Sequence, residues 1–367
     1  MRGSVAAVAV VVIGCGGPVV NDYTRAVASA ERAYSAGRYE EAAREWARAE
    51  HAAVRTRDRD EAAYLEAAAL ARAGRDADAV RAYGELVRRS PRGERTARAL
   101  LDRAALRARA GDAAGSFADL DAIVTDHPES GAARAALAAC VDAKRRDGEG
   151  AVRTYLDERA AKLGATELGE SIASAYADSL SRSGDLEAAK ARYLDAANRY
   201  PYPEGRLWDD SLFHAAELAE RLGNPSEAAL LLERLLAARE TAYVQGSYER
   251  ARYGEARFHL GELYRDALRD PAKARAEFEI LFREHRNSRL RDDGAWNAAL
   301  LARQAGDEAG ACRLAHGIVQ ELPESRYAAC VSHLCPAERP PEKAGPCHEY
   351  LLRERPPGGR TPPGDGP

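Results

Sequence analysis

Four cysteines near the C-terminal end of this 367-residue chain offer its clearest side-chain chemistry. In chain order they are Cys312, Cys330, Cys335 and Cys347. Cysteines grouped in this way favour disulfide bonds when the protein folds in an oxidising compartment. We expect Cys312 to pair with Cys330, because adjacent antiparallel helices bring such positions together, and Cys335 to pair with Cys347 as a second bridge. The first bridge would lock a capping helix, about residues 326–334, onto the helices before it.

The same segment carries the ligand types of a zinc site, so metal binding is the alternative use of its cysteines. His333 lies two residues before Cys335, and His348 directly follows Cys347. Structural zinc prefers tetrahedral sets of Cys and His at paired short spacings, and this spacing is not a familiar one. We therefore expect oxidised cysteines and no metal or other cofactor. Cys140 lies in an alanine-rich segment and is expected to be a small buried hydrophobe.

A sixth cysteine, Cys15, follows an apolar run at the N-terminus. Met1-Arg2 gives a short positively charged region, and Val5–Ile13 is an uninterrupted run of apolar residues. This run is too short to span a bilayer and fits a secretory signal peptide. An ordinary signal peptide with a chance cysteine is the simpler alternative.

The end of the apolar run, Val12-Ile13-Gly14-Cys15, resembles a bacterial lipobox. The resemblance implies that residues 1–14 are a removed signal peptide and that lipidated Cys15 begins the mature chain. An inner-membrane retention signal would have Asp at position 16. The Gly16 found here implies that the lipidated protein is located on the periplasmic side of the outer membrane. Residues 15–21 would then form a short tether.

The rest of the sequence lacks the arrangements that usually carry catalysis. It has no glycine-rich phosphate loop, no His-Glu-x-x-His and no serine in a strained-turn motif. The formal net charge of −4 argues against a nucleic-acid-binding protein, which usually presents a basic face. The sequence therefore predicts neither an enzyme nor a nucleic-acid partner.

A phrase that recurs about every 37 residues indicates which elements position these cysteines. From a turn glycine it runs Ala five residues on, an aromatic residue or Leu at nine, an aliphatic residue or Ala at twelve, and Pro at seventeen. Gly74-Ala79-Tyr83-Leu86-Pro91 is a complete copy, and Gly184-Ala189-Tyr193-Ala196-Pro201 also matches throughout. Eight copies can be traced, of which the fourth and seventh are the weakest. Self-similarity at such a period is typical of a solenoid.

The spacing has a physical cause. Glycine ends one helix because it readily adopts a left-handed backbone, and proline ends the next because it cannot continue a helix. Offsets of five, nine and twelve fall on one stripe of the helix between them. We therefore expect an all-α chain over residues 22–335, built from eight antiparallel helix pairs without a sheet. Residues 336–367 contain nine of the 17 prolines and are expected to be a disordered tail, apart from a helical turn at His348–Leu352.

The phrase resembles the tetratricopeptide repeat (TPR), which has a Leu-Gly-x-x-Tyr segment in its first helix and Ala-x-x-x-Phe in its second. Leu260-Gly261-Glu262-Leu263-Tyr264 matches the first segment, and Ala274-Arg275-Ala276-Glu277-Phe278 matches the second. The resemblance implies a right-handed α-solenoid of about eight TPR-like helix pairs with a C-terminal capping helix. It also implies that the first helices of the pairs line a concave surface.

Counting back from each turn gives the residues expected on that surface, and in the last repeats these are acidic with one aromatic side chain per repeat. The candidate partner-binding residues are Phe213, Glu217, Glu220, Phe258, Glu262 and Trp296. Such a surface would suit an extended or helical segment with Lys or Arg and some apolar anchors. The simpler alternative is that the aromatics fill the seam between repeats and the acids are only solvated.

These expectations combine into a membrane-anchored periplasmic scaffold for protein–protein interactions in the cell envelope. The chain resembles the TPR lipoprotein of the outer-membrane β-barrel assembly machinery and the TPR coordinators that act with the Tol–Pal system. Its partners would be other envelope proteins or peptide segments, with the membrane reached through the lipid anchor. The alternative is a docking or accessory subunit of an envelope enzyme complex.

Overall fold

The computed structural model describes residues 21–238, 240–242, 246–248, 250 and 252–352. The signal peptide, Cys15, nearly all of the tether and the last fifteen residues of the predicted tail lie outside these ranges. The chain divides into two compact units, with the boundary between Ala143 and Lys144. Each unit is described separately below.

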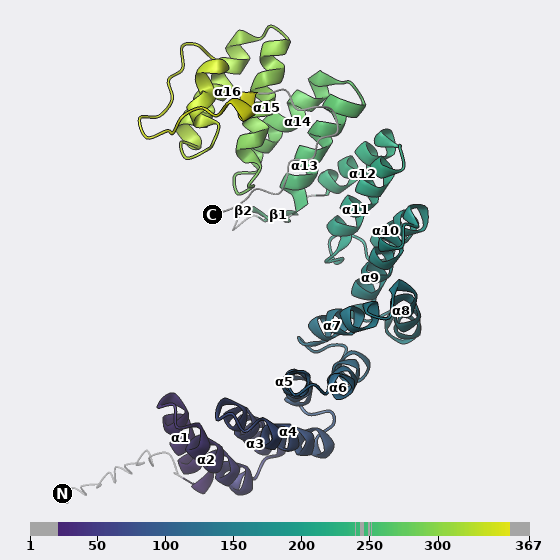
Figure 1. The fold of residues 1–367 in the computed structure, drawn as a ribbon, viewed down its shortest axis with the longest axis vertical. Helices are drawn as coiled ribbons and strands as arrows, with labels where there is room; N and C mark the ends of the chain where they lie inside the picture. Colours follow the sequence, from purple (N-terminus) through teal and green to yellow (C-terminus); the bar gives the residue numbers. More distant parts are fainter. Residues whose placement is uncertain (1–20, 239, 243–245, 249, 251, 353–367) are drawn as a thin grey trace, which may run out of the picture. The chain divides into compact units, whose positions relative to one another are not determined.

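The first unit is built from helices that alternate in direction along the chain (Figure 1). Its helices are α1 (Asp22–Ser35), α2 (Tyr39–Ala52), α3 (Thr56–Arg72), α4 (Asp76–Arg89), α5 (Thr96–Arg109), α6 (Ala113–Asp126) and most of α7 (Ala133–Arg145). Alanine has the highest helix propensity and dominates these segments. Connections of only a few residues make neighbouring helices antiparallel, so α1–α2, α3–α4 and α5–α6 form the first three pairs.

The second unit continues the same helix-turn-helix pattern and adds a closing segment at its C-terminal end (Figure 1). Its elements are α8 (Glu149–Leu163), α9 (Leu168–Arg182), α10 (Leu186–Arg199), α11 (Trp208–Arg221), α12 (Pro225–Ala237), α13 (Arg252–Glu262), the π-helical turn Leu263–Ala267, α14 (Pro271–Glu284), α15 (Arg291–Gln304), α16 (Glu308–Glu321), the 3-10 helix Ala328–His333 and α17 (Glu349–Leu352). The predicted helix-pair architecture is confirmed.

The turns inside the pairs follow the predicted glycine frame. Seven glycines have a left-handed backbone, with φ between 75° and 102°: Gly37, Gly74, Gly111, Gly148, Gly184, Gly223 and Gly306. The seventh pair lacks the glycine, and Arg269 takes the left-handed position with φ of 56°. Here the Leu268 N–H donates to the Leu263 carbonyl at 2.9 Å, so the helix widens to a π-turn before it ends. This extra length explains why the seventh copy is weak in the sequence.

The expectation of no sheet is wrong at one place. Two three-residue strands, β1 (Glu240–Ala242) and β2 (Gly246–Tyr248), pair antiparallel between α12 and α13. Helix α12 ends at Ala237, because the sequence beyond it includes residue types such as Thr and Tyr that favour extended backbone.

The C-terminal end also differs from expectation. The expected capping helix, about residues 326–334, is present as the 3-10 helix Ala328–His333. The predicted tail is ordered as far as Leu352, because Leu351 in α17 is buried in the core of the last repeats. Within the described residues, no helix is both long enough and apolar enough to cross a membrane.

Candidate interaction surface

The three aromatic residues expected to anchor a partner are buried. Phe213, Phe258 and Trp296 are only 8%, 5% and 3% exposed. The Phe258 ring lies 5.5 Å from that of Phe278 on α14, and Trp296 stacks on Tyr327 of the closing segment at 4.8 Å. Their prediction as exposed anchors is therefore wrong. Large rings at these positions fill the seam, because burying them removes the most apolar area from water.

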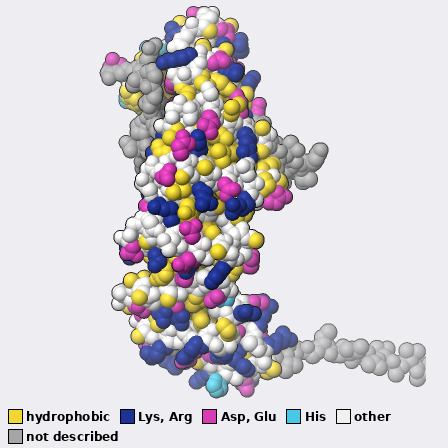
Figure 2. Space-filling view, turned by 90° about the vertical axis from the view of Figure 1, so that its right-hand side faces the viewer, with side chains coloured by type: hydrophobic (Ala, Val, Ile, Leu, Met, Phe, Trp, Pro, Cys, Tyr) yellow, Lys and Arg dark blue, Asp and Glu magenta, His cyan; other side chains and the backbone are white. Residues whose placement is uncertain are grey.

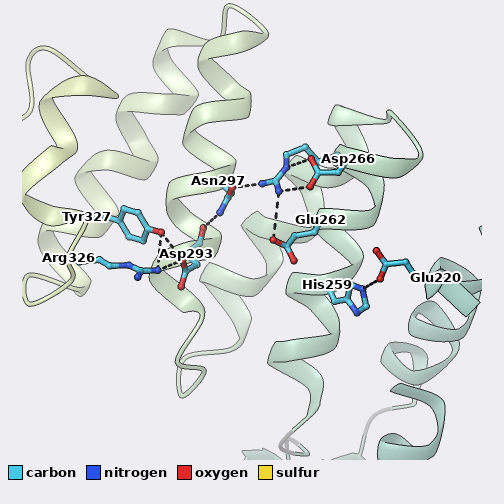
Figure 3. Close-up of polar contacts among 9 residues, drawn as sticks. Glu220, His259, Glu262, Asp266, Asp293, Asn297, Arg326 and Tyr327 are labelled. Carbon is cyan, nitrogen blue, oxygen red and sulfur yellow. Dashed lines mark hydrogen bonds and ion pairs between the residues drawn. The ribbon is translucent and has the colours of Figure 1, made fainter. Parts of the chain in front are cut away.

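The acidic residues of the prediction lie on the first helices of the sixth and seventh pairs, where Glu220 and Glu262 belong to a polar strip that continues to the closing segment (Figure 3). We define the polar strip as Glu217, Glu220, His259, Glu262, Arg265, Asp266, Asp293, Asn297 and Arg326. Its first link joins α11 to α13, where His259 Nε2 lies 2.8 Å from Glu220 Oε2. Glu217, Glu220 and Glu262 have side chains 28%, 39% and 22% exposed, so all three remain accessible.

Arg265 is the centre of the strip. Its guanidinium donates to Asp266 at 2.7 Å and to Asn297 on α15 at 2.5 Å, and it lies 3.7 Å from Glu262. Burial opposes the charge of Arg265, but the hydrogen bond to Asp266 and the negative charges of Asp266 and Glu262 together outweigh that cost and raise its pKa. The strip therefore holds a fixed positive charge between acidic side chains and joins the seventh pair to the eighth.

The last link ties α15 to the closing segment. Asp293 is buried and accepts hydrogen bonds from Arg326 and from the Tyr327 hydroxyl, both at 2.7 Å. Asn297 donates to the backbone carbonyl of Asp293 at 2.7 Å, so the Arg265 and Arg326 clusters are continuous. Buried polar groups that are satisfied in this way fix the relative placement of the helices that carry them.

The strip has groups for recognition but no arrangement for covalent chemistry. Five carboxylates, two guanidiniums, an imidazole and an amide can accept and donate hydrogen bonds to a polypeptide. The described part of the chain contains no group of three or more His, Cys, Asp or Glu residues that could hold a metal ion. A polar partner with an excess of positive charge fits this composition.

The C-terminal cysteines form two disulfides, but the expected pairing is wrong. Cys312 on α16 bonds to Cys335, and Cys330 bonds to Cys347. The capping helix is shorter than expected, and the chain directly after it brings Cys335 next to Cys312 on α16. Cys330, inside the capping helix, then lies next to Cys347 in the segment that follows. Because both bridges use their sulfur atoms, Cys335 and Cys347 supply no thiolates to the alternative zinc site. Cys140 is fully buried, as expected of a small hydrophobe.

Sequence reasoning found part of the strip and missed the rest. Counting from the turns placed Glu217, Glu220 and Glu262 on this surface, but it did not single out His259, Asp266 or Asn297. Each of these three directly follows a counted position. The helix period alone therefore places them beside the predicted surface and not on it. Arg326 and Tyr327 were visible only as part of a repeat end, because their contacts depend on how the closing segment folds back.

Comparison with known proteins supports the repeat assignment at one pair. The tetratricopeptide repeat family model matches residues 255–288, which cover most of α13, the π-turn and all of α14. No curated protein matches the chain. The chain is therefore an α-helical repeat protein, and its seventh helix pair is a tetratricopeptide repeat.

Solved structures with a similar arrangement are also TPR proteins. PilF of Pseudomonas aeruginosa is 15% identical with a TM-score of 0.39, and the match covers 62% of this chain and 93% of PilF. A TPR protein from Parabacteroides merdae is 12% identical with a TM-score of 0.35, covering 76% of this chain and 98% of that protein. YrrB, a TPR protein with an unusual peptide-binding site, is 11% identical with a TM-score of 0.30, covering 67% and 94%. Similarity at this level carries no argument about partners.

At the level of its class, a TPR array of this kind serves protein–protein interaction, because stacked helix pairs create an extended surface with many separate contact positions.

Proposed function

We propose that this protein is a lipid-anchored scaffold on the periplasmic side of the bacterial outer membrane that holds envelope proteins together. The observation that carries the proposal is the pair of disulfides, Cys312–Cys335 and Cys330–Cys347. Disulfides persist in the periplasm and are rare in a reducing cytosol. They agree with the apolar N-terminal run that ends at Cys15, which independently predicts export.

The polar strip is the surface that we assign to the partner. It offers partly exposed carboxylates at Glu217, Glu220 and Glu262, and the rings beside them are buried in the seam. The partner segment would therefore be recognised by Lys or Arg and by backbone hydrogen bonds, and not by deep aromatic anchors. Exposed charges of this kind guide the encounter and set orientation more than they hold the complex.

The anchor is tested by acyl labelling in a bacterial host. Cys15→Ser should abolish incorporation of a labelled fatty acid, whereas Cys140→Ser should leave it unchanged as a matched control. A second chain with residues 1–17 replaced by a cleavable signal peptide should appear in the soluble periplasmic fraction. Acyl labelling that survives in Cys15→Ser would remove the lipid anchor from the proposal.

The partner surface is tested by photo-crosslinking in intact cells. A photoreactive residue at Glu217 on α11 should capture a defined envelope protein. The same residue at Leu230 on α12, which is 65% exposed in the same repeat, should not capture it. Equal capture at both positions, or capture at Leu230 alone, would contradict the assignment of the polar strip.

A further inference from the structure

Six arginines and one glutamate occupy two neighbouring loops of the first unit. The loops are residues 53–57, between α2 and α3, and residues 88–95, at the end of α4 and before α5. We call them together the anchor-side edge. The equivalent loop of the third pair, residues 125–132, has two acids and no Lys or Arg. Within the first unit, the excess of positive charge at these loops thus lies in the first two pairs.

Contacts between the two loops show that they form one surface. Arg57 lies 3.3 Å from Glu94, with side chains 79% and 72% exposed. Arg89, at the end of α4, pairs with Glu50 on α2 and lies 3.3 Å from Asp60 on α3. The edge is therefore continuous across the first two helix pairs.

Three of its arginines keep their charge available. Arg55, Arg88 and Arg92 are exposed, and none forms an ion pair with any residue in the described part of the chain. Beside them Val54 is 92% exposed, the highest value among the exposed large hydrophobic residues of the described chain. An exposed apolar side chain among unpaired guanidiniums suits an interface with lipid headgroups, where phosphates meet apolar material.

The opposite end of the same helix pairs differs. At the tight turns, Arg38 pairs with Glu41, Arg75 with Asp78 and Arg109 with Asp76. Acids in the first turn of the second helices supply these partners, as is usual near helix N-termini. Arg32 and Arg72 near these turns are also exposed and form no ion pair with the described residues, so what sets the loop edge apart is the exposed Val54 beside its three unpaired arginines. Figure 2 shows Lys and Arg side chains interspersed with Asp and Glu over the face in view.

Chain length determines which end of the first pair would lie near the proposed anchor. Seven residue steps separate Cys15 from Asp22, the first residue of α1, so a fully extended tether reaches about 25 Å. Because α1 and α2 are antiparallel and joined by a short turn, the start of α1 and the loop after α2 lie at the same end of the pair. The tight turn lies a helix length of about 21 Å further away.

We propose that the anchor-side edge, residues 53–57 and 88–95, contacts the phosphate-bearing headgroups of the membrane to which Cys15 attaches the chain. This inference rests on the lipid anchor of the proposed function. Val54 enters the headgroup region, and Arg55, Arg57, Arg88 and Arg92 contact lipid phosphates. The contact orients the first unit with its tight turns away from the membrane.

The test uses fluorescence quenching with the full lipidated chain in vesicles of phosphatidylcholine and phosphatidylglycerol that carry brominated acyl chains. Val54→Trp places a new indole on the edge, and Ala36→Trp places one at the tight turn of the same pair as a matched control. The native Trp46, Trp208 and Trp296 are buried and contribute equally to both variants. We expect strong quenching for Val54→Trp and none beyond the native background for Ala36→Trp. Equal quenching of the two, or none for either, would overturn the inference.

A second pair of variants separates charge recognition from mere proximity. In the Val54→Trp background, we replace Arg55, Arg57, Arg88 and Arg92 by Gln. The equilibrium constant for binding of the anchor-side edge to the membrane should fall by about fivefold per arginine, and quenching should fall with it. Replacing Arg38, Arg72, Arg75 and Arg109 by Gln at the tight turns should leave quenching unchanged. Quenching that is insensitive to the first set, or identical in vesicles of pure phosphatidylcholine, would show that no phosphate recognition occurs.

Acyl labelling of the same preparations distinguishes the two proposals. Labelled protein without Val54→Trp quenching would refute the edge contact and leave the anchor intact. Absence of label at Cys15 would refute the anchor and, with it, this inference.

Discussion

The first and last helix pairs bury the same kind of seam with different side chains. In the core of the first two and a half pairs, twelve of 17 buried residues are alanine, and Trp46 and Tyr83 are the two aromatic residues. In the core of the last three pairs and the cap, twelve of 36 are alanine and nine are aromatic. Alanine lets helices approach closely but removes little apolar area from water, whereas rings remove a large area. We expect the last pairs to gain more stability from packing.

The disulfides increase this difference. Both bridges lie at the end of the aromatic-rich core, where Cys330, Cys335 and Leu351 belong to the same buried cluster. The alanine-rich pairs rely instead on surface pairs between neighbouring helices, such as Arg95 with Glu61, and exposed pairs contribute little. The comparison therefore predicts that the second unit tolerates heat and denaturant better than the first.

The largest expected effect comes from removing a seam ring. Phe258→Ala should destabilise the second unit by about 3–5 kcal/mol, because it leaves a cavity against Phe278. Denaturant unfolding followed by Trp208 and Trp296 measures the loss, and Trp46 reports on the first unit in the same experiment. If Phe258→Ala left stability unchanged and only weakened partner capture, Phe258 would be a binding residue after all.

Opening the disulfides should have the next largest effect. Cys347→Ser removes the bridge to Cys330, whose two cysteines are 17 residues apart, and should lower the stability of the second unit by about 3 kcal/mol. Differential scanning calorimetry with and without reductant should show a larger shift for the unmodified chain, because reductant opens both bridges. The transition reported by Trp46 should not move, since the described first unit contains neither bridge. An equal shift of both transitions would show that the two units do not differ in their dependence on the disulfides.

A smaller, pH-dependent effect is expected in the first unit. Burial, followed by the nearby carboxylates of Glu50 and Glu85, raises the pKa of Glu66 from 4.5 to about 7. The folded state therefore holds this proton more tightly than the unfolded state, so the contribution of Glu66 falls as pH rises from about 4.5 to about 7. Glu66→Gln should remove that fall and stabilise the unit above pH 7 relative to the unmodified chain.

The measurement is the Trp46-reported unfolding free energy between pH 5 and about 8, the interval that spans the raised pKa of Glu66. Glu40→Gln, an exposed substitution on α2, serves as the control and should keep the pH dependence of the unmodified chain. Parallel pH curves for Glu66→Gln and the unmodified chain would show that Glu66 does not carry the effect.

The repeat architecture was predictable because it depends on local spacing. Gly74 and its counterparts fix where helices end, and Ala79 and Tyr83 fix which stripe is buried, so period and residue type suffice. The pairing of residues 240–242 with 246–248 escaped prediction because a three-residue strand gives too few positions for a period. Disulfide pairing also escaped it, since pairing depends on where the closing segment places Cys335 and not on separation along the chain.

The candidate surface was only half predictable for a related reason. A helical period assigns Phe258 and Glu262 to the same stripe, four residues apart, and cannot tell that one packs inward against Phe278 while the other reaches solvent. Side-chain length and the neighbouring helix decide that outcome. Contacts such as Arg265 with Asn297 join different repeats, so they follow only from the assembled fold.

Partner capture by charge variants tests the central claim, that the polar strip is the partner surface, most directly. Glu217, Glu220 and Glu262 are replaced together by Lys, and the control replaces the exposed acids Glu187, Glu308 and Glu324 outside the strip in the same way. With helical content shown to be unchanged in both, affinity for the crosslinked partner is measured at low and at physiological salt. The strip variant should lose at least about tenfold in affinity at low salt and less at higher salt, while the control should bind like the unmodified chain. Equal affinities for the two variants would contradict the account and place the partner on another surface.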